Sequence, residues 1–216
     1  MRTGRRSTDV GLIAVSKTVP PERLRLALVA GIERFGENRV QEAAPKVAAL
    51  PGAHWELVGT LQSNKARRAV ELFEVIHSVD SIELARRLDR IVAEIGRPPL
   101  PVYLQVNVDE DPSKAGLSLP ELSPGLDELL ALAGLELRGL MTVGRLGQRA
   151  EDSRPTFVRL RELSERCRAK QPRLGPGLSM GMSDDFEVAV EEGATVVRVG
   201  RAIFGERPPA EANPAS

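Results

Sequence analysis

The sequence alternates eight times between a short apolar run of strand length and a longer stretch with helical periodicity. The clearest helical stretch, residues 81–96, repeats its apolar residues at a spacing close to 3.6. Parallel strands joined by crossover helices produce such alternation, whereas two-layer sandwiches do not. Strands are expected at residues 11–16, 32–37, 54–59, 73–79, 101–108, 135–143, 177–181 and 194–200.

Eight strand–helix units favour an α/β fold with a single closed (β/α)8 TIM barrel, and an open doubly wound sheet is the structural alternative. The chain of 216 residues is long enough for one such barrel. We expect the barrel over residues 11–206, a flexible N-terminal segment over 1–10, and a disordered tail rich in proline and alanine over 207–216. The stretch LPELSPGLDELLALAG is expected to be helical with a break.

The composition argues against several classes of function. Lysine plus arginine and aspartate plus glutamate balance at 30 each, so no overall field attracts nucleic acid or an anionic membrane. The basic N-terminus lacks the apolar region of a signal peptide, and no window reaches the length of a membrane span. The single Cys167 excludes an intramolecular disulfide, and no cysteine–histidine cluster has metal-ligand spacing. We expect a cytoplasmic protein without a metal site, a nucleic-acid partner or a membrane partner.

Polar residues follow the predicted strands, at the end of a barrel where chemistry normally takes place. Lys17 follows the first strand, and Glu37 and Asn38 follow the second. Apolar neighbours would desolvate the Lys17 amine, lower its pKa and leave it nucleophilic toward an aldehyde. The plain alternative is a surface lysine at a strand end. The acids at 109–111 suggest a cation site but are expected to lie in a solvated loop.

The last two units suggest a phosphate site. Ser183 in MGMSDD is expected to be the N-cap of a helix beginning at Asp184, which by itself would be an ordinary capped helix. In VRVGRAIFG the N–H groups of Gly200 and Arg201 open the last helix. Loops after strands seven and eight commonly hold phosphate in barrels. Arg198 should point into the barrel mouth. An aldehyde that carries a phosphate, such as pyridoxal 5′-phosphate, would suit both ends of this site.

Seven motifs in order resemble one known family: AVSKTVP, FGENRVQE, VGTLQSNK, HSVDS, QVNVDEDPSKAG, GLMTVG and LSMGMSDDFEVAVEEGATVVRVGRAIFG. Together they closely resemble the pyridoxal phosphate homeostasis proteins, from about residue 12 to residue 205. The resemblance implies a fold-type III barrel like the N-terminal domain of alanine racemase. It also implies that pyridoxal 5′-phosphate is bound as an internal aldimine.

The resemblance assigns roles to individual residues. Lys17 would be the aldimine lysine. Ser183, with the backbone of Gly200 and Arg201, would hold the phosphate. Arg198 would face the pyridine nitrogen and keep it unprotonated, so that the ring is a weaker electron sink. Asn38 and Met141 would line the pocket.

Two departures from the family pattern stand out. The family usually has a helix before the first strand, whereas ten residues precede Gly11 here, so we expect that side of the barrel to be less well covered. The family often has threonine after the glycine at 200. Arg201 stands there instead, so a hydroxyl to the phosphate is lost and a cation partly replaces it.

A racemase would need a second acid–base group opposite the lysine, and the sequence offers no clear candidate. Tyr103, the single tyrosine, lies early in the fifth strand and thus far from the expected mouth. His54 begins the third strand at the other barrel end, and His77 is expected to hydrogen-bond within its loop. The leading hypothesis is therefore a carrier for intracellular vitamin B6 homeostasis, without an established catalytic activity. The alternatives are a racemase or decarboxylase that uses the same cofactor, and an interaction protein with basic helices.

The expected partners are pyridoxal 5′-phosphate, amino acids and apo-enzymes that receive the cofactor. A monomer or weak dimer is expected.

Overall fold

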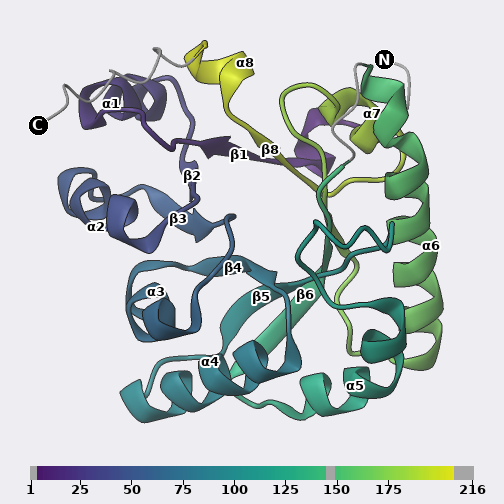
Figure 1. Ribbon diagram of the computed structural model, residues 1–216. Coiled ribbons are helices and arrows are strands. Elements are labelled where there is room, and N and C mark those ends of the chain that lie inside the picture. The colour runs from purple at the N-terminus through teal and green to yellow at the C-terminus, as the bar shows by residue number, and fades with distance from the viewer. Residues whose placement is uncertain (1–3, 145–148, 207–216) are drawn as a thin grey trace, which may run out of the picture.

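Eight parallel strands close into one barrel with helices on its outside (Figure 1). The computed structural model describes residues 4–144 and 149–206. The strands follow one another around the barrel in sequence order, and β1 pairs with β8, which confirms the predicted (β/α)8 architecture. The strands are β1 (Gly11–Val15), β2 (Arg34–Glu37), β3 (His54–Leu57), β4 (Val75–Val79), β5 (Leu100–Gln105), β6 (Leu135–Met141), β7 (Gly177–Ser179) and β8 (Val196–Val199).

Helices follow each strand and cover the outside of the barrel. Short 3-10 turns add η1 (Ser7–Asp9), η2 (Ser63–Lys65) and η3 (Ala150–Ser153). The α-helices are α1 (Pro21–Val29), α2 (Val40–Ala49), α3 (Ala66–Leu72), α4 (Ile82–Ile95), α5 (Leu119–Ala131), α6 (Arg154–Lys170), α7 (Phe186–Glu191) and α8 (Arg201–Phe204).

Helix α5 differs from the sequence expectation, because it continues through Pro124 without a break. Ser118 and Glu121 form a capping box at its start, which satisfies N–H groups of the first turn. One face of α5 is buried against the barrel, including Leu126 and Leu129. Burial of that face outweighs the single backbone hydrogen bond that the proline removes.

The strands bury side chains on both faces. Outward-facing residues such as Phe35 and Leu104 pack under the helices in one large apolar core. A smaller cluster of Ile13, Tyr103, Met141 and Val196 is separate from it. Because the pleat alternates with a period of two, each strand contributes to both layers.

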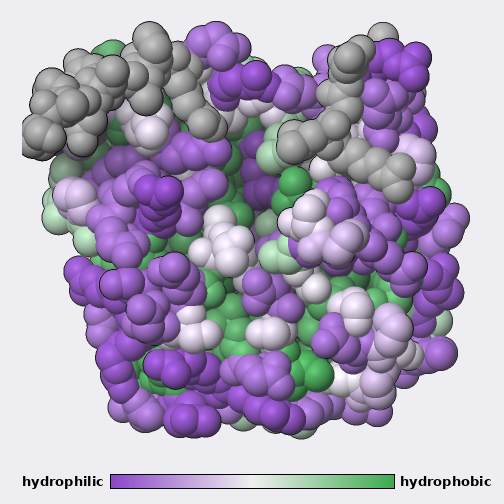
Figure 2. All heavy atoms as spheres, in the orientation of Figure 1, coloured by the Kyte–Doolittle hydropathy of each residue, from purple (hydrophilic) through white to green (hydrophobic). Residues whose placement is uncertain are grey.

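The surface is mainly polar over the helices. Figure 2 shows hydrophilic residues on the ridges of the visible face and hydrophobic residues mostly in the recesses between them. Within the ranges that the structure describes, no helix has both the length and the apolarity to cross a bilayer. Arg5 donates to the Val190 carbonyl (3.1 Å), which ties the N-terminal segment to α7. The flexible segment expected at residues 1–10 stays a prediction, and the expected tail at 207–216 lies outside the described residues.

Candidate functional site

A cavity of about 640 Å³ opens at the end of the barrel where the carboxyl ends of the strands meet. Parallel strands in sequence order bring the loops after β1, β2, β7 and β8 to this one end. Its lining includes all seven residues expected at the site: Lys17, Asn38, Met141, Ser183, Arg198, Gly200 and Arg201.

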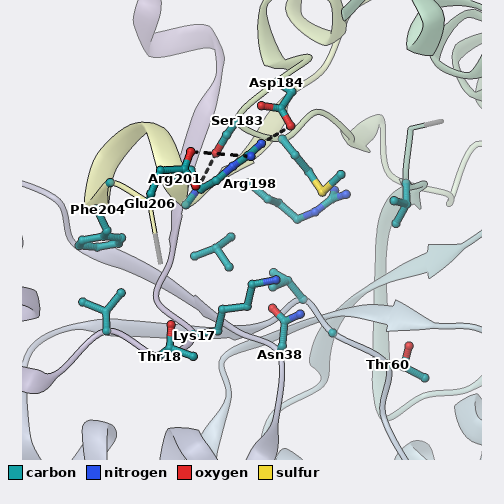
Figure 3. Close-up of a pocket in the computed structure, with 18 of the residues that line it drawn as sticks. Lys17, Thr18, Asn38, Thr60, Ser183, Asp184, Arg198, Arg201, Phe204 and Glu206 are labelled. Atoms are coloured by element: carbon teal, nitrogen blue, oxygen red, sulfur yellow. Dashed lines mark hydrogen bonds and ion pairs between the residues drawn. The ribbon is translucent and has the colours of Figure 1, made fainter. Parts of the chain in front are cut away.

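Lys17 enters the cavity from a tight turn at the end of β1. The N–H of Val19 donates to the Ser16 carbonyl (3.0 Å), and Thr18 has a φ of 64°, a region that non-glycine residues rarely adopt. Figure 3 shows the Lys17 side chain extending toward Asn38, on the opposite side of the cavity from Ser183 and Arg201. The side chain is thus half-buried and directed into the cavity.

A buried ion pair fixes the backbone next to Lys17. Lys46 donates to the Ser16 carbonyl (2.7 Å) and to Glu37 Oε1 (2.6 Å), and the Ser16 hydroxyl donates to the same carboxylate oxygen (2.6 Å). Glu37 was expected at the barrel mouth, but it is fully buried beside α2 and does not line the cavity. Burial raises the pKa of Glu37, although Lys46 and Ser16 oppose this shift.

Asn38 is held by close backbone packing. A Cβ at Gly59 would lie 2.3 Å from the Asn38 carbonyl oxygen and 2.6 Å from its Cα. Both residues line the cavity. The absence of a side chain at Gly59 is therefore required for the loops after β2 and β3 to meet.

Ser183 does not cap the helix that follows it, which corrects the sequence expectation. Helix α7 begins at Phe186, and its N-cap position is Asp185, whose carboxylate accepts from the Met182 N–H (2.7 Å). The Ser183 hydroxyl oxygen accepts instead from the N–H of Gly200 (3.1 Å) and of Ala202 (3.4 Å). Ser183 therefore joins the loop after β7 to the first turn of α8.

Arg201 is ion-paired with Asp184 across the same two loops. Its side chain is 44 % exposed, and both residues line the cavity. The Arg201 guanidinium, which was expected to replace a hydroxyl in part, thus already has a carboxylate partner. Its positive charge at the cavity is correspondingly reduced.

Arg198 points from β8 into the barrel and reaches the cavity. It donates to the Ser179 hydroxyl (2.8 Å) and to the Thr142 carbonyl (2.9 Å), and the residue is only 4 % exposed. Burial lowers the pKa of Arg198 to about 10, so the guanidinium remains charged at neutral pH.

The two histidines and the tyrosine lie away from the cavity lining. His54 and Tyr103 line a second cavity at the opposite barrel end, where both were expected. His77 was expected to hydrogen-bond within a loop, but it is fully buried within β4, where it bonds Glu56 and Ser179 and stacks on Tyr103. Among the described residues, no histidine, tyrosine or cysteine lines the main cavity.

Sequence reasoning missed several lining residues, among them Thr18, Thr60 and Gln105. Thr60 follows β3 closely, so the rule that places chemistry after strand ends could have found it. Gln105 is the last residue of β5 and follows the inward alternation from Tyr103. Its amide is already engaged, because it donates to the Ala115 carbonyl (2.8 Å).

The lining fits a small molecule with a reactive carbonyl at one end and an anion at the other. An amine enters from one wall, and the opposite wall carries a hydroxyl beside a turn of backbone N–H groups. The buried guanidinium of Arg198, which donates to Ser179 of β7, lies inside the barrel below this cavity mouth. Pyridoxal 5′-phosphate has the matching groups. Within the described ranges, no cluster of histidine, cysteine, aspartate and glutamate could hold a metal ion.

Comparison with known proteins is consistent with this geometry. Residues 2–208 match the family described as "Alanine racemase, N-terminal domain". The chain is 46% identical over 208 residues to the pyridoxal phosphate homeostasis protein of Pseudomonas aeruginosa, covering 94% of this chain and 87% of that protein.

Solved structures of the same fold agree with this comparison. PipY of Synechococcus elongatus, in a structure with pyridoxal phosphate bound, superposes with a TM-score of 0.86 at 46% identity, over 94% of this chain and 96% of PipY. An alanine racemase from Clostridium difficile shares the fold alone, with a TM-score of 0.74 at 14% identity, over 94% of this chain and 57% of that enzyme.

Proposed function

Because the chain belongs to the pyridoxal phosphate homeostasis proteins, which share the fold of the alanine racemase N-terminal domain, we propose that it binds pyridoxal 5′-phosphate in the cavity at the barrel mouth. Its role is to hold this cofactor for vitamin B6 homeostasis in the cytoplasm and to pass it to apo-enzymes.

The observation that carries the proposal is that one cavity contains both the Lys17 side chain and the turn of Ser183 and Gly200. These residues are more than 160 positions apart in the sequence, and the closure of β1 on β8 brings their loops together. A plain surface lysine at a strand end would not require the turn of Ser183 and Gly200 in the same cavity.

Each wall has a defined part in binding. Lys17 would be the covalent anchor. The Ser183 oxygen accepts backbone N–H groups, so its own proton is left to donate to a phosphate oxygen. Arg198 would face the pyridine nitrogen as a charged donor. When bound, the cofactor supplies an aldehyde that reacts reversibly with amines and a ring that withdraws electrons.

The same lining supports a holding role. A two-base reaction at the α-carbon of an amino acid needs a second acid–base group opposite the lysine, and the described lining has neither imidazole nor phenol. Amino acids would therefore meet the bound cofactor without rapid racemisation. A monomer is sufficient for this site, because one chain supplies the lining described above.

A visible absorption spectrum tests the proposal. The protein mixed with pyridoxal 5′-phosphate should gain a visible band, and borohydride should then fix the cofactor on the peptide that contains Lys17. A Lys17→Ala protein should lose the band and the labelled peptide, whereas the exposed Lys170→Ala should keep both. Retention of the band by Lys17→Ala would refute the assignment of Lys17, and no band in the unaltered protein would refute cofactor binding.

A further inference from the structure

A continuous chain of hydrogen bonds runs through the barrel interior and ends at Arg198. Arg34 Nε donates to Glu56 Oε1 (2.6 Å), and Glu56 Oε2 lies 2.6 Å from His77 Nε2. His77 Nδ1 lies 2.8 Å from the Ser179 hydroxyl, which also accepts from Arg198 Nη1 (2.8 Å). One end lies at the second cavity, and the other end lines the cofactor cavity.

From Arg198 to Glu56 the donors of this hydrogen-bond chain point the same way, and Arg34 donates to Glu56 from the other side. A guanidinium can only donate, so the Ser179 oxygen accepts from Arg198 and its proton is free to bond His77 Nδ1. Nδ1 then acts as an acceptor, which places the His77 proton on Nε2. From there it is donated to the carboxylate of Glu56. Aligned bonds of this kind polarise one another in a low dielectric.

Burial of these polar side chains costs free energy unless each of them has a hydrogen-bond partner. Glu56 is 2 % exposed, and His77 and Ser179 are fully buried. Burial by itself would raise the pKa of Glu56, but the hydrogen bonds from His77 and Arg34 outweigh it and hold that pKa below its ordinary value. Burial lowers the pKa of His77, so this imidazole is neutral at neutral pH.

Arg198 is the charged group at the cavity end of this hydrogen-bond chain. Arg198 bonds directly to two neutral groups, the Ser179 hydroxyl and the Thr142 carbonyl. Glu56 is itself shared with Arg34, and the carboxylate of Asp185 acts on Arg198 through space. The charged Arg198 guanidinium, at the end that lines the cofactor cavity, is thus held by hydrogen bonds to neutral groups.

We propose that Glu56, His77 and Ser179 are positioning residues that fix Arg198 and hold its charged guanidinium at the cofactor cavity. They touch no cavity occupant and act through Arg198. The identity of that occupant rests on the proposed function above. The hydrogen-bond relay, which runs from Arg198 through Ser179 and His77 to Glu56, is in contrast a property of the protein alone. Apolar side chains such as Ile13 could fill the same interior, and they would leave Arg198 without an aligned partner.

Histidine NMR tests the relay without any cofactor. The sequence has two histidines, so nitrogen-labelled imidazoles give two sets of signals that a His54→Gln protein assigns. The groups around His77 are Glu56, Arg34, Arg198, Ser179 and Tyr103. His77 should carry its proton on Nε2 and titrate below its ordinary pKa of about 6.5. A proton on Nδ1, or titration near pH 6.5, would overturn the relay.

The affinity for pyridoxal 5′-phosphate tests whether the relay residues affect cofactor binding through Arg198. Ser179→Ala and Glu56→Gln should each weaken binding of pyridoxal 5′-phosphate about tenfold, as expected for one lost bond to a charged group. They should also shift the visible band of the bound form. Ile13→Val, an interior change outside the relay, should lower the unfolding temperature while leaving affinity and band unchanged.

Two variants at His77 separate the halves of the relay. His77→Asn keeps an acceptor near Nδ1 for Ser179, and His77→Gln keeps a donor near Nε2 for Glu56. If the folded His77→Gln protein binds more weakly than His77→Asn, the contact with Ser179 is the one that reaches Arg198. Unchanged affinity and band in both folded His77 variants and in Ser179→Ala would overturn the proposal. If the unaltered protein binds no cofactor, the proposed function fails, and the NMR result alone decides the relay.

Discussion

At the scale of single residues, the buried charges of this protein have specific partners. Lys46 and Glu37 lie under the turn that presents Lys17, and their side chains are 10 % and 0 % exposed. Lys46 reaches both the carboxylate and the Ser16 carbonyl, so one ammonium group joins α2 to the end of β1. Removal of one partner from such a pair leaves an uncompensated buried charge.

The first prediction concerns this pair. Lys46→Met should destabilise the fold by about 3 kcal/mol, because Glu37 loses its charged partner. Urea unfolding measures the change. The double variant Lys46→Met/Glu37→Gln should recover part of the loss, since no buried charge remains. Equal losses in the single and double variants would mean that the pair contributes through packing alone.

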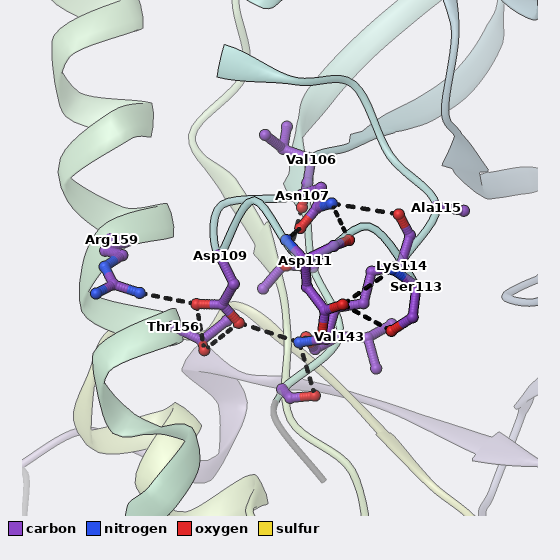
Figure 4. Close-up of polar contacts among 12 residues, drawn as sticks. Val106, Asn107, Asp109, Asp111, Ser113, Lys114, Ala115, Val143, Thr156 and Arg159 are labelled. Atoms are coloured by element: carbon purple, nitrogen blue, oxygen red, sulfur yellow. Dashed lines mark hydrogen bonds and ion pairs between the residues drawn. The ribbon is translucent and has the colours of Figure 1, made fainter.

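At the scale of elements, one carboxylate attaches the loop after β5 to helix α6 (Figure 4). Asp109 accepts from Lys114 (3.0 Å), Thr156 (2.8 Å) and Arg159 (2.9 Å), and its side chain is 2 % exposed. The sequence suggested a solvated acidic loop here, which is wrong for Asp109. Lys114 continues the link to the Val143 carbonyl (3.2 Å), so the loops after β5 and β6 are held together.

The second prediction tests this attachment. Asp109→Ala should destabilise the protein by about 2 kcal/mol, because the buried Thr156 hydroxyl loses its acceptor. Hydrogen exchange should rise in residues 106–118. The matched control is Asp111→Ala, because the Asp111 carboxylate accepts from the backbone N–H and the hydroxyl of Ser113 within its own loop. If exchange rises equally in both variants, the contact with α6 does not hold the loop.

At the scale of the whole molecule, closure makes the first and last elements neighbours. β1 pairs with β8 from Gly11–Val196 to Ala14–Val199, and Arg23 of α1 donates to the Phe204 carbonyl (2.6 Å). Every strand therefore has two partners, and separation of any half of the barrel breaks two strand interfaces. Such coupling favours cooperative unfolding.

The third prediction follows from closure. Urea transitions measured by far-UV circular dichroism and by fluorescence should coincide. Trp55, the single tryptophan, is 3 % exposed, and the centroid of its ring lies 5.4 Å from that of Phe35. Its fluorescence therefore reports on β2 and β3. A fluorescence transition at a lower urea concentration would show that this part of the barrel unfolds independently.

The sequence determined the fold and the strand ends at which the candidate site lies. The apolar alternation requires strands and covering helices in turn, and parallel strands in sequence order must end at the same mouth. For this reason Lys17 and Gly200 could be assigned to one cavity before any distance was known. Both inferences depend on local patterns that a single strand and its helix contain.

The tertiary structure decided where individual polar side chains find their partners. His77 meets Ser179 from 102 positions away, and Ser183 bonds Gly200 rather than its own helix. Glu37 turns outward to Lys46. Local patterns specify which face a residue occupies. A hydrogen bond, in contrast, forms between whichever donor and acceptor the closed barrel brings within about 3 Å, and that depends on all eight strands at once.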